Sequence, residues 1–309
     1  MTKKILIDCD PGLDDALALL LAHGDPNLEL VGVTTVGGNV GIDRTTANAL
    51  ALREYLGFDR VPVAQGAGEP LSGARKEASH VHGVSGLGTV ELPEPRHPLS
   101  ELNAVELIIE TLSAHPGEVH LVAIGPLTNI ANALAVEPAI AGLAASLTIM
   151  GGSFTRGNAT PAAEFNIFAD PVAAKTVFAA DWQVNMVGLD LTLQAHASAA
   201  VVDSFRPLGR LADDFIVPLA TFWVDPFDSQ WQGQALHDVC AVALVSRPDL
   251  FECRPARVEV ETKGEFTSGM TVVNFNSLNP NALVPVTLDV AGFWDCVRGS
   301  YARIAADYR

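Results

Sequence analysis

Short apolar runs alternate along the chain with longer segments of helical periodicity. An apolar run of about four to eight residues that ends at polar residues or glycine predicts a buried strand. Apolar positions that recur every three or four residues predict an amphipathic helix. Strands are expected at residues 4–8, 29–36, 61–64, 119–124, 147–150 and 184–189, and helices at 13–22, 42–56, 102–114, 127–134 and 171–180.

The carboxyl-terminal third continues this pattern less regularly. Helices are expected at residues 211–223 and 236–246, and further strands at 257–262, 270–274 and 286–290. Repeated strand–helix alternation is typical of an α/β protein with an open, mostly parallel, Rossmann-like sheet flanked by helices. No linker, repeat or low-complexity tract interrupts the chain, so residues 1–309 are expected to form a single domain.

Polar residues or glycines follow the carboxyl ends of most predicted strands. They are Asp8 and Asp10, residues 37–39, 125–129 and 151–158, and Asp190. Because ligands of open α/β sheets bind outside the carboxyl ends of the strands, the ligand site is expected at this edge. Residues 65–98, rich in Gly, Pro and His, predict a long surface segment, and loops of that length are often functional.

Charge and cysteine usage narrow the class of protein. The net charge of −17 argues against partners such as nucleic acid or anionic membranes and fits an enzyme with a small-molecule substrate. No Cys-x-x-Cys pair occurs, so a zinc knuckle is not expected. The chain opens MTKKILIDCD, without a long apolar signal segment, and no apolar run reaches the roughly 18 residues of a transmembrane helix. We expect a cytoplasmic protein with reduced thiols.

The first predicted strand runs into a dense group of acids. Asp8, Asp10, Asp14 and Asp15 surround a Pro-Gly turn that precedes a helix. Carboxylates repel one another and are costly to bury, and a helix N-terminus offsets only part of the charge. A hard cation, Ca²⁺ or Mg²⁺, would offset the remainder through oxygen ligands. The alternative is an N-capping aspartate beside solvated acids, which fits a cluster of four less well.

Two later segments carry further polar side chains. His237 and Asp238 open an apolar helical run, either as additions to the acid site or as a structural histidine beside an N-capping aspartate. The segment GGSFTRGNATPAAEFNIFADP contains Asn158, Glu164, Asn166 and Asp170. Asn and Glu suit sugar hydroxyls because they offer donors and acceptors in fixed geometry. The alternative is a turn-rich loop whose Asp170 caps the next helix.

Together these motifs resemble the nucleoside hydrolases of the inosine-uridine-preferring family. The resemblance is carried by Asp8-Cys9-Asp10-Pro11-Gly12-Leu13-Asp14-Asp15, Gly37-Gly38-Asn39, His82-Gly83, Gly86-Leu87, Gly125-Pro126-Leu127-Thr128-Asn129, Met150-Gly151-Gly152, Glu164-Phe165-Asn166 and His237-Asp238. These motifs occur in the family's order and spacing, and the first is the most specific of them.

The resemblance implies hydrolysis of the N-glycosidic bond of ribonucleosides to ribose and a free base, by a homodimer or homotetramer with tightly bound Ca²⁺. By position, the metal ligands would be the carboxylates of Asp10, Asp15 and Asp238 and the carbonyl of Ile124. The residues that would bind the substrate are Asp14, Asn39, His82, Met150, Asn158, Glu164, Phe165 and Asn166.

The implied chemistry agrees with these residue types. Cleavage passes through an oxocarbenium-like sugar, whose positive charge is favoured by carboxylates and amide oxygens. Ca²⁺ would position a water, and Asp10 would take its proton as general base. The leaving base needs protonation or a strong hydrogen bond, for which His237 is the first candidate and His82 the second.

The segment before His237 departs from the family's pattern. Relatives that cleave inosine or uridine often carry tyrosines there, whereas this chain has FWVDPFDSQWQGQ. Phe227 and Trp231 can stack on a base, but phenylalanine has no proton to give and tryptophan is a weak donor. Val84 and Ser85 stand where purine-specific relatives stack a tryptophan, which disfavours that subgroup. The preferred base therefore stays open at this stage.

Two other classes share part of the pattern. A haloacid-dehalogenase-type phosphatase also begins with a strand and Asp-x-Asp, and would use Asp8 as nucleophile and Asp10 as acid with Mg²⁺. That family has Thr or Val two residues after the second Asp, where this chain has Gly12. A non-catalytic ribose- or nucleoside-binding protein would keep the ribose ligands, but the presence of Asp10 favours catalysis.

Overall fold

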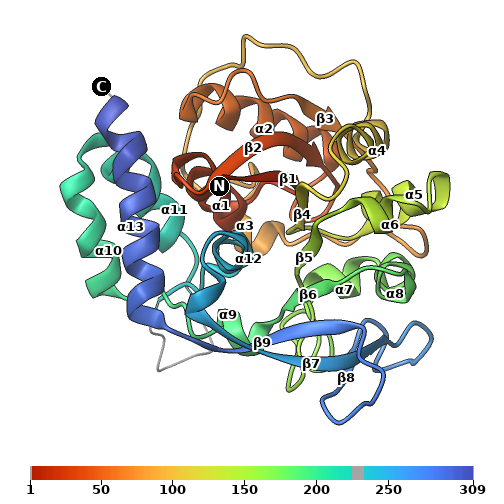
Figure 1. Cartoon of the computed structure of the whole chain (residues 1–309). Helices are drawn as coiled ribbons and strands as arrows, with labels where there is room; N and C mark the ends of the chain where they lie inside the picture. Colours follow the sequence, from red (N-terminus) through yellow and green to blue (C-terminus); the bar gives the residue numbers. More distant parts are fainter. Residues whose placement is uncertain (1, 225–232, 309) are drawn as a thin grey trace.

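The computed structural model describes residues 2–224 and 233–308, and within them the chain is organised around a nine-stranded sheet (Figure 1). The strand order is β3-β2-β1-β4-β5-β6-β9-β7-β8. The strands are β1 (Lys3–Cys9), β2 (Leu28–Thr35), β3 (Val63–Gln65), β4 (Val119–Ala123), β5 (Ser146–Met150), β6 (Val184–Val187), β7 (Phe251–Val260), β8 (Thr271–Asn274) and β9 (Ala282–Leu288). Neighbours from β3 to β9 pair in parallel, whereas β7 is antiparallel to β9 and β8. The predicted mostly parallel α/β sheet is confirmed.

Helices cover both faces of the sheet (Figure 1). One face carries α1 (Leu13–Gly24), α2 (Ile42–Leu56), α10 (Ala199–Phe205), α11 (Val217–Thr221), α12 (His237–Ser246) and α13 (Val290–Asp307). The other carries α4 (Ala104–Ala114), α5 (Thr128–Val136), α6 (Ile140–Leu143) and α8 (Pro171–Ala179). The short elements are α3 (Ser79–His82), α7 (Phe165–Ala169), α9 (Leu189–Thr192), the 3₁₀ turns η1 (Arg206–Leu208) and η3 (Pro248–Leu250), and the π-helical turn η2 (Ala212–Ile216).

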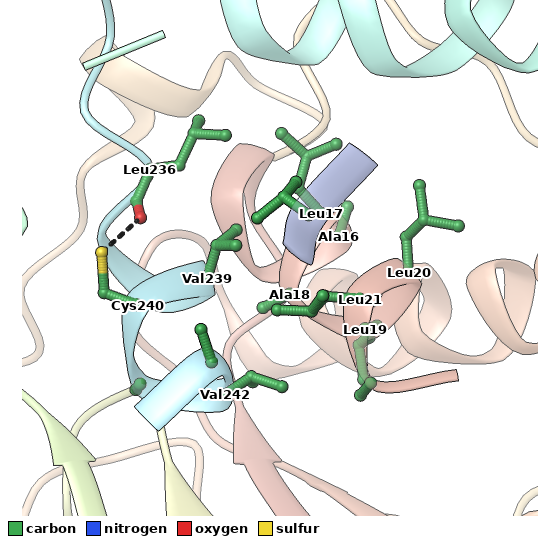
Figure 2. Packing of buried hydrophobic residues seen from close by; sticks show 14 of the residues in the cluster. Ala16, Leu17, Ala18, Leu19, Leu20, Leu21, Leu236, Val239, Cys240 and Val242 are labelled. Carbon is green, nitrogen blue, oxygen red and sulfur yellow. Dashed lines mark hydrogen bonds between the residues drawn. The ribbon is translucent and has the colours of Figure 1, made fainter. Parts of the chain in front are cut away.

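The two apolar cores lie on opposite sides of the central strands. Successive side chains of a strand point to opposite faces, so Ile5 and Ile7 of β1 enter the core with α1 and α12, and Leu6 enters the core with α4 and α5. All three are fully buried, which explains why β1 reads as a continuous apolar run. Figure 2 shows leucines of α1 packed with Val239 and Val242 of α12 in the first of these cores.

The carboxyl-terminal region differs most from the prediction. The strand expected at 257–262 begins earlier, as β7, and the strand expected at 286–290 is β9, which ends at Leu288. Helix α13, eighteen residues long, was not predicted. Its buried stripe is narrow and includes Phe293, Trp294, Val297 and Tyr301, while two glycines dilute its helical character.

The order of strands changes direction beside β1. Strands β2 and β3 lie on one side of β1, and β4, β5 and β6 follow on the other. Open α/β sheets bind ligands at such a switch point, outside the carboxyl ends of the strands. The residues that directly follow β1 and β4 therefore occupy the expected ligand crevice.

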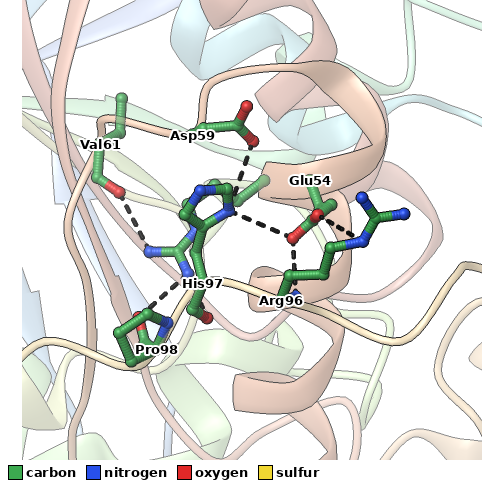
Figure 3. A network of polar contacts seen from close by, with 7 residues as sticks. Glu54, Asp59, Val61, Arg96, His97 and Pro98 are labelled. Carbon is green, nitrogen blue, oxygen red and sulfur yellow. Dashed lines mark hydrogen bonds and ion pairs between the residues drawn. The ribbon is translucent and has the colours of Figure 1, made fainter.

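The long segment 65–98 is fastened at its far end to α2. The Arg53 guanidinium donates to the carbonyls of Val61, His97 and Pro98 over 3.4, 2.7 and 3.0 Å. Glu54 accepts the Arg96 N–H over 2.8 Å and contacts His97 Nδ1 at 3.3 Å (Figure 3). We term Arg53, Glu54, Asp59, Arg96 and His97 the α2 network.

Within the described ranges no helix is long and apolar enough to cross a membrane.

Candidate active site

The ends of β1 and β4 lie side by side at the switch point. Asp8 pairs with Ala123, and the Ile124 N–H donates to the Asp8 carbonyl over 2.8 Å. This pairing sets the turn after β1 against the turn after β4. Asp10 and the Ile124 carbonyl are thereby carried to the same edge of the sheet, where the sequence predicts the ligand site.

The Asp10 carboxylate fits between two glycines. A Cβ at Gly38 would lie 2.1 Å from Asp10 Oδ2, and one at Gly125 would lie 2.6 Å from Oδ1, so both positions need glycine. Oδ2 accepts the Asn39 N–H over 2.6 Å. Oδ1 is buried and has no hydrogen-bond partner among the described residues. One carboxylate oxygen of Asp10 thus has no partner in the part of the chain that the structure describes.

Helix α1 contributes two further acids in its first turn. The buried Asp15 carboxylate accepts the N–H groups of Asp10 and Gly12 over 3.1 and 2.9 Å. It also accepts from Asn39 Nδ2 over 3.1 Å. Asp14 is buried and accepts hydrogen bonds from the backbone at the start of α12. The Pro-Gly turn therefore folds both acids back toward the end of β1.

Asp238, in the first turn of α12, completes the group. One carboxylate oxygen from each of Asp14, Asp15 and Asp238 lies within 4.8 Å of the others. Packing of α1 against α12 (Figure 2) brings the two helix starts together. Asp238 does not cap α12, because Leu236 occupies the N-cap position, so the N-cap alternative is wrong. We term Asp10, Asp14, Asp15 and Asp238 the acid cluster.

Burial of these like charges dominates the electrostatics of the site. Desolvation, opposed by backbone hydrogen bonds, raises the pKa of Asp15 to about 7. Desolvation, followed by repulsion from neighbouring acids, raises the pKa of Asp10 and of Asp238 well above the usual aspartate range. None of the ion pairs found in the described ranges involves the acid cluster. Among the described residues, therefore, no side chain balances this charge through an ion pair.

The acid cluster has the donor chemistry of a hard-cation site. Its ligand atoms are all oxygens, one of them buried without a partner, and buried charges in proteins are paired or coordinate metals. The structure brings Asp14 into the closest group, although the sequence predicts it as a ribose ligand. Asp10, predicted as a metal ligand, lies beside that group rather than within it.

Asn166 connects two strand ends at the far side of the site. Its Nδ2 donates to the carbonyls of Ile124 and Met150 over 2.9 and 3.1 Å. Nδ2 also lies 3.5 Å from the Met150 sulfur. Three of the predicted site residues are therefore in direct contact, and the Ile124 carbonyl faces this contact.

Two predicted ribose ligands also have structural roles. Glu164 is the N-cap of α7, and its carboxylate accepts the N–H groups of Asn166, Ile167 and Gly152 over 2.8, 3.1 and 2.9 Å. Burial outweighs these bonds and raises the pKa of Glu164 to about 7. Asn158 is exposed and accepts the Phe165 N–H over 2.9 Å, and Phe165 is half-buried. These bonds fix the conformation of the loop.

His82 binds the start of α1. Its Nδ1 accepts the Leu13 N–H over 3.1 Å, and a Cβ at Gly12 would lie 2.3 Å from the same nitrogen. The ring is buried, and desolvation, opposed by the Asp14 charge, lowers the pKa of His82. The segment predicted as a surface loop thus places one histidine inside the site.

His237 lies at the first position of α12 and is half-buried. Its Nδ1 lies 2.7 Å from the Thr192 hydroxyl oxygen, at the end of α9. Desolvation, followed by the His196 charge, lowers the pKa of His237 to about 4. The ring is therefore neutral near neutral pH and acts as a hydrogen-bond donor or acceptor rather than as a cation.

Asn129 is a site-supporting residue to which the sequence analysis assigned no role. Its Nδ2 donates to Asp8 Oδ1 and the Thr35 carbonyl over 2.8 and 2.9 Å, and its Oδ1 accepts the Ala67 N–H over 2.8 Å. The sequence signal that could have indicated this role of Asn129 is the Gly-Pro-Leu-Thr-Asn motif. Asp8 Oδ1 also accepts the Thr34 hydroxyl over 2.6 Å. A fully buried Asp8 held in this way is not an accessible nucleophile, which disfavours the phosphatase alternative.

The side of the site expected to face the base is only partly described. Phe227 and Trp231 lie outside the described residues. Val84 is 84% exposed and its side chain does not contribute to the buried part of the site. Phe222 packs closely on Gly83 and Gly88, so its ring contacts the turn that follows His82.

Comparison with known proteins identifies the family. The family model described as inosine-uridine preferring nucleoside hydrolase matches residues 5–295. The chain is 42% identical to the inosine-uridine preferring nucleoside hydrolase of Leishmania major, over 98% of this chain and 99% of the relative. It is also 42% identical to the pyrimidine-specific ribonucleoside hydrolase RihA of Citrobacter koseri, over 96% of each chain.

Solved structures agree with these sequence matches. The purine-preferring ribonucleoside hydrolase from Gardnerella vaginalis superposes with a TM-score of 0.92 and 31% identity, over 98% of this chain and 99% of that one. A plant nucleoside hydrolase gives a TM-score of 0.90 and 30% identity, with the same coverage. The chain belongs to the inosine-uridine preferring nucleoside hydrolase family. The resemblance inferred from the sequence motifs is confirmed.

Proposed function

We propose that this chain hydrolyses the N-glycosidic bond of ribonucleosides at the acid cluster, with Ca²⁺ as cofactor, giving ribose and a free base. Membership of the family makes the chain a ribonucleoside N-ribohydrolase. The observation that carries the assignment of the site is the convergence of three buried carboxylates beside Asp10 at the switch point. One domain, residues 1–309, would carry the activity.

The proposed metal ligands are the carboxylates of Asp10, Asp15 and Asp238 and the carbonyl of Ile124. The choice of Ca²⁺ rests on the all-oxygen donor set and on the family resemblance. Bound there, Ca²⁺ would orient the ribose 2′- and 3′-hydroxyls and make a nearby water more acidic. Its charge would also offset the repulsion within the acid cluster.

Two asparagines would accept hydrogen bonds from ribose hydroxyls. The Asn39 Nδ2 donates to Asp15 and to the Asp10 carbonyl, and the Asn166 Nδ2 donates to backbone carbonyls. With both nitrogens used by protein oxygens, the amide oxygens are left as acceptors. Asp14 would hold a further ribose hydroxyl, and Asn158 and Glu164 the 5′-hydroxyl. Met150, Phe165 and His82 would line the sugar.

The reacting groups would act on opposite sides of the sugar. Asp10 takes a proton from the attacking water through its unpartnered Oδ1, while the water oxygen bonds to the anomeric carbon. The electron pair of the breaking C–N bond moves onto the base. His237, whose pKa burial lowers to about 4, stabilises that charge by a hydrogen bond from its ring, in the manner of a neutral histidine electrophile.

A panel of ribonucleosides assayed for free ribose, with and without a chelator, tests this proposal. We expect release from inosine or uridine, loss of activity with chelator, and recovery with Ca²⁺. 2′-Deoxyuridine should be a poor substrate, because the missing hydroxyl leaves buried polar groups unpaired. Equal kcat/KM for uridine and 2′-deoxyuridine would contradict the ribose assignment. Metal analysis that found zinc, or no metal in active protein, would contradict the cofactor assignment.

The base preference is open to the same panel. The relatives are named for inosine and uridine, for pyrimidines and for purines, so their names do not select one base. We also propose a cytoplasmic homodimer or homotetramer, on the family resemblance alone. Light scattering after size-exclusion chromatography would measure the assembly.

A further inference from the structure

We propose that Thr192 is a positioning residue for the leaving-group step. Its hydroxyl donates to Nδ1 of His237, which fixes the ring proton on Nε2. The Nε2–H group can then donate a hydrogen bond to the departing base. This inference rests on the proposed function of His237. No role was assigned to Thr192 from the sequence.

The direction of the hydrogen bond follows from the contacts of the Thr192 hydroxyl. Its oxygen lies 2.7 Å from His237 Nδ1 and 3.5 Å from the Leu189 carbonyl oxygen. The first distance is normal for a strong bond, whereas the second is beyond the usual range for a hydroxyl donor. The Leu189 carbonyl already accepts the Leu193 N–H over 3.0 Å. We therefore take Nδ1, the nearer of the two contacts, as the acceptor of the hydroxyl hydrogen.

A neutral imidazole carries one proton, and its position decides what the ring can do. If Nδ1 accepts, the proton resides on Nε2, and Nε2–H can donate to charge that develops on the base. If the proton were on Nδ1, Nε2 would carry only a lone pair and would repel that charge. Thr192 thus selects the tautomer that assists departure of the base.

The surroundings hold Thr192 firmly enough for this role. The residue is fully buried, and its N–H donates to the Gly188 carbonyl over 3.1 Å. The start of α9 is fixed in turn by a bond of 2.9 Å from the Leu189 N–H to the Gly152 carbonyl. On the other side, the backbone of His237 is held by Asp14. Both partners of the hydroxyl–imidazole bond are therefore anchored to the site.

Thr192→Val and Thr192→Ser make a matched pair, because valine keeps the shape and serine keeps the hydroxyl. We expect Thr192→Val to lower kcat/KM for inosine or uridine by roughly 10-fold, the scale of a lost orienting hydrogen bond. The same variant should cleave p-nitrophenyl riboside at nearly the wild-type rate, since that leaving group needs no assistance. Thr192→Ser should act like the wild type on both substrates.

Two further measurements separate this role from a structural one. Nitrogen-15 NMR of labelled histidine rings should show one ring that loses its fixed Nε2–H tautomer in Thr192→Val and keeps it in Thr192→Ser. His237→Ala, assayed with the same two substrates, tests the function on which the inference depends.

The outcomes are distinguishable. The role of Thr192 would be overturned if Thr192→Val lowered kcat/KM equally for both substrates, or for neither. It would also be overturned if Thr192→Ser failed to keep wild-type activity. A loss in His237→Ala that is confined to inosine or uridine would at the same time leave the proposed function standing. If His237→Ala lowers kcat/KM for both substrates in parallel, the proposed role of His237 fails, and the inference about Thr192 fails with it.

Discussion

Charged side chains gather in two regions of the molecule, the acid cluster at the switch point and the α2 network beside the long segment. In the α2 network the Arg53 guanidinium donates to three carbonyls, and Glu54 faces Arg96 and His97 (Figure 3). In the acid cluster four buried carboxylates face one another, and no side chain in the described ranges forms an ion pair with them.

The difference separates charge used for the fold from charge used for a ligand. The side chains of the α2 network contact opposite charges or backbone carbonyls and hold a loop, although Arg53 Nε has no hydrogen-bond partner among the described residues. Buried like charges lower stability unless a ligand offsets them, so local conflict of this kind is expected at functional sites. Variants in the two regions should therefore change different observables.

The largest effect is expected from Asp15→Ala. This change removes a proposed ligand and leaves the N–H groups of Asp10 and Gly12 without their acceptor. Metal content and ribose release should fall together, with activity down by about a thousand-fold or more, because several kcal/mol of charge stabilisation are lost with the metal. Elemental analysis and a ribose assay on one sample measure both. A variant that is active without metal would remove the acid cluster from the mechanism.

Asp10→Asn should lower kcat by at least ~100-fold, the usual scale for a positioned general base. The Asn39 N–H can still be accepted by an amide oxygen, so the fold should survive. Ca²⁺ content must be measured in the same preparation, because Asp10 is also a proposed ligand. Near-normal turnover with metal in place would assign the water-activating role to another group.

Arg53→Ala tests the α2 network, the second of the two regions compared. The buried guanidinium makes three bonds to carbonyls, and we expect its loss to lower the free energy of unfolding by about 2 kcal/mol. Metal content and kcat should stay at wild-type levels. Denaturant unfolding and a ribose assay test this, with Glu54→Gln as the milder control in the same network. A large loss of kcat at unchanged metal content would show that the network serves the site.

The smallest effect, and the one of opposite sign, is expected from Asp238→Asn in the metal-free protein. Removing one of four repelling carboxylates should raise the melting temperature by about 1–2 °C, corresponding to about 1 kcal/mol for a chain of this size. Added Ca²⁺ should stabilise the wild type and leave the variant unchanged. Thermal scans with chelator and with Ca²⁺ measure this. A lower melting temperature in chelator would mean that the carboxylate has a protein partner.

Local pattern was sufficient for the parts of the site that are contiguous in sequence. The run from Asp8 to Asp15 joins a short buried strand, a Pro-Gly turn and a helix start, and each of these has a sequence signal. The strand order could not be read in this way, but the alternation of strands and helices was enough to place ligands at the carboxyl ends. The resemblance then supplied the distant ligand Asp238.

Contacts between distant residues were not predictable from pattern. The Thr192 hydroxyl meets His237 only because the end of α9 and the start of α12 come together in the fold, and nothing in either segment predicts the contact. In the sequence Asn129 is one more polar residue at a helix start. Its bonds to Asp8 and Ala67 are visible only in the structure. Helix α13 was missed because its apolar stripe is narrow and interrupted by glycine.

The packing of α1 against α12 has a consequence for how the chain would acquire the proposed Ca²⁺. Asp14 and Asp15 belong to the first helix, whereas Asp238 lies more than 200 residues further along. Closing a loop of that length costs on the order of 5 kcal/mol of chain entropy. A chain still being synthesised lacks the site until α12 has emerged and docked. Uptake of Ca²⁺ during refolding should therefore report the final step of assembly, after the early strands have paired.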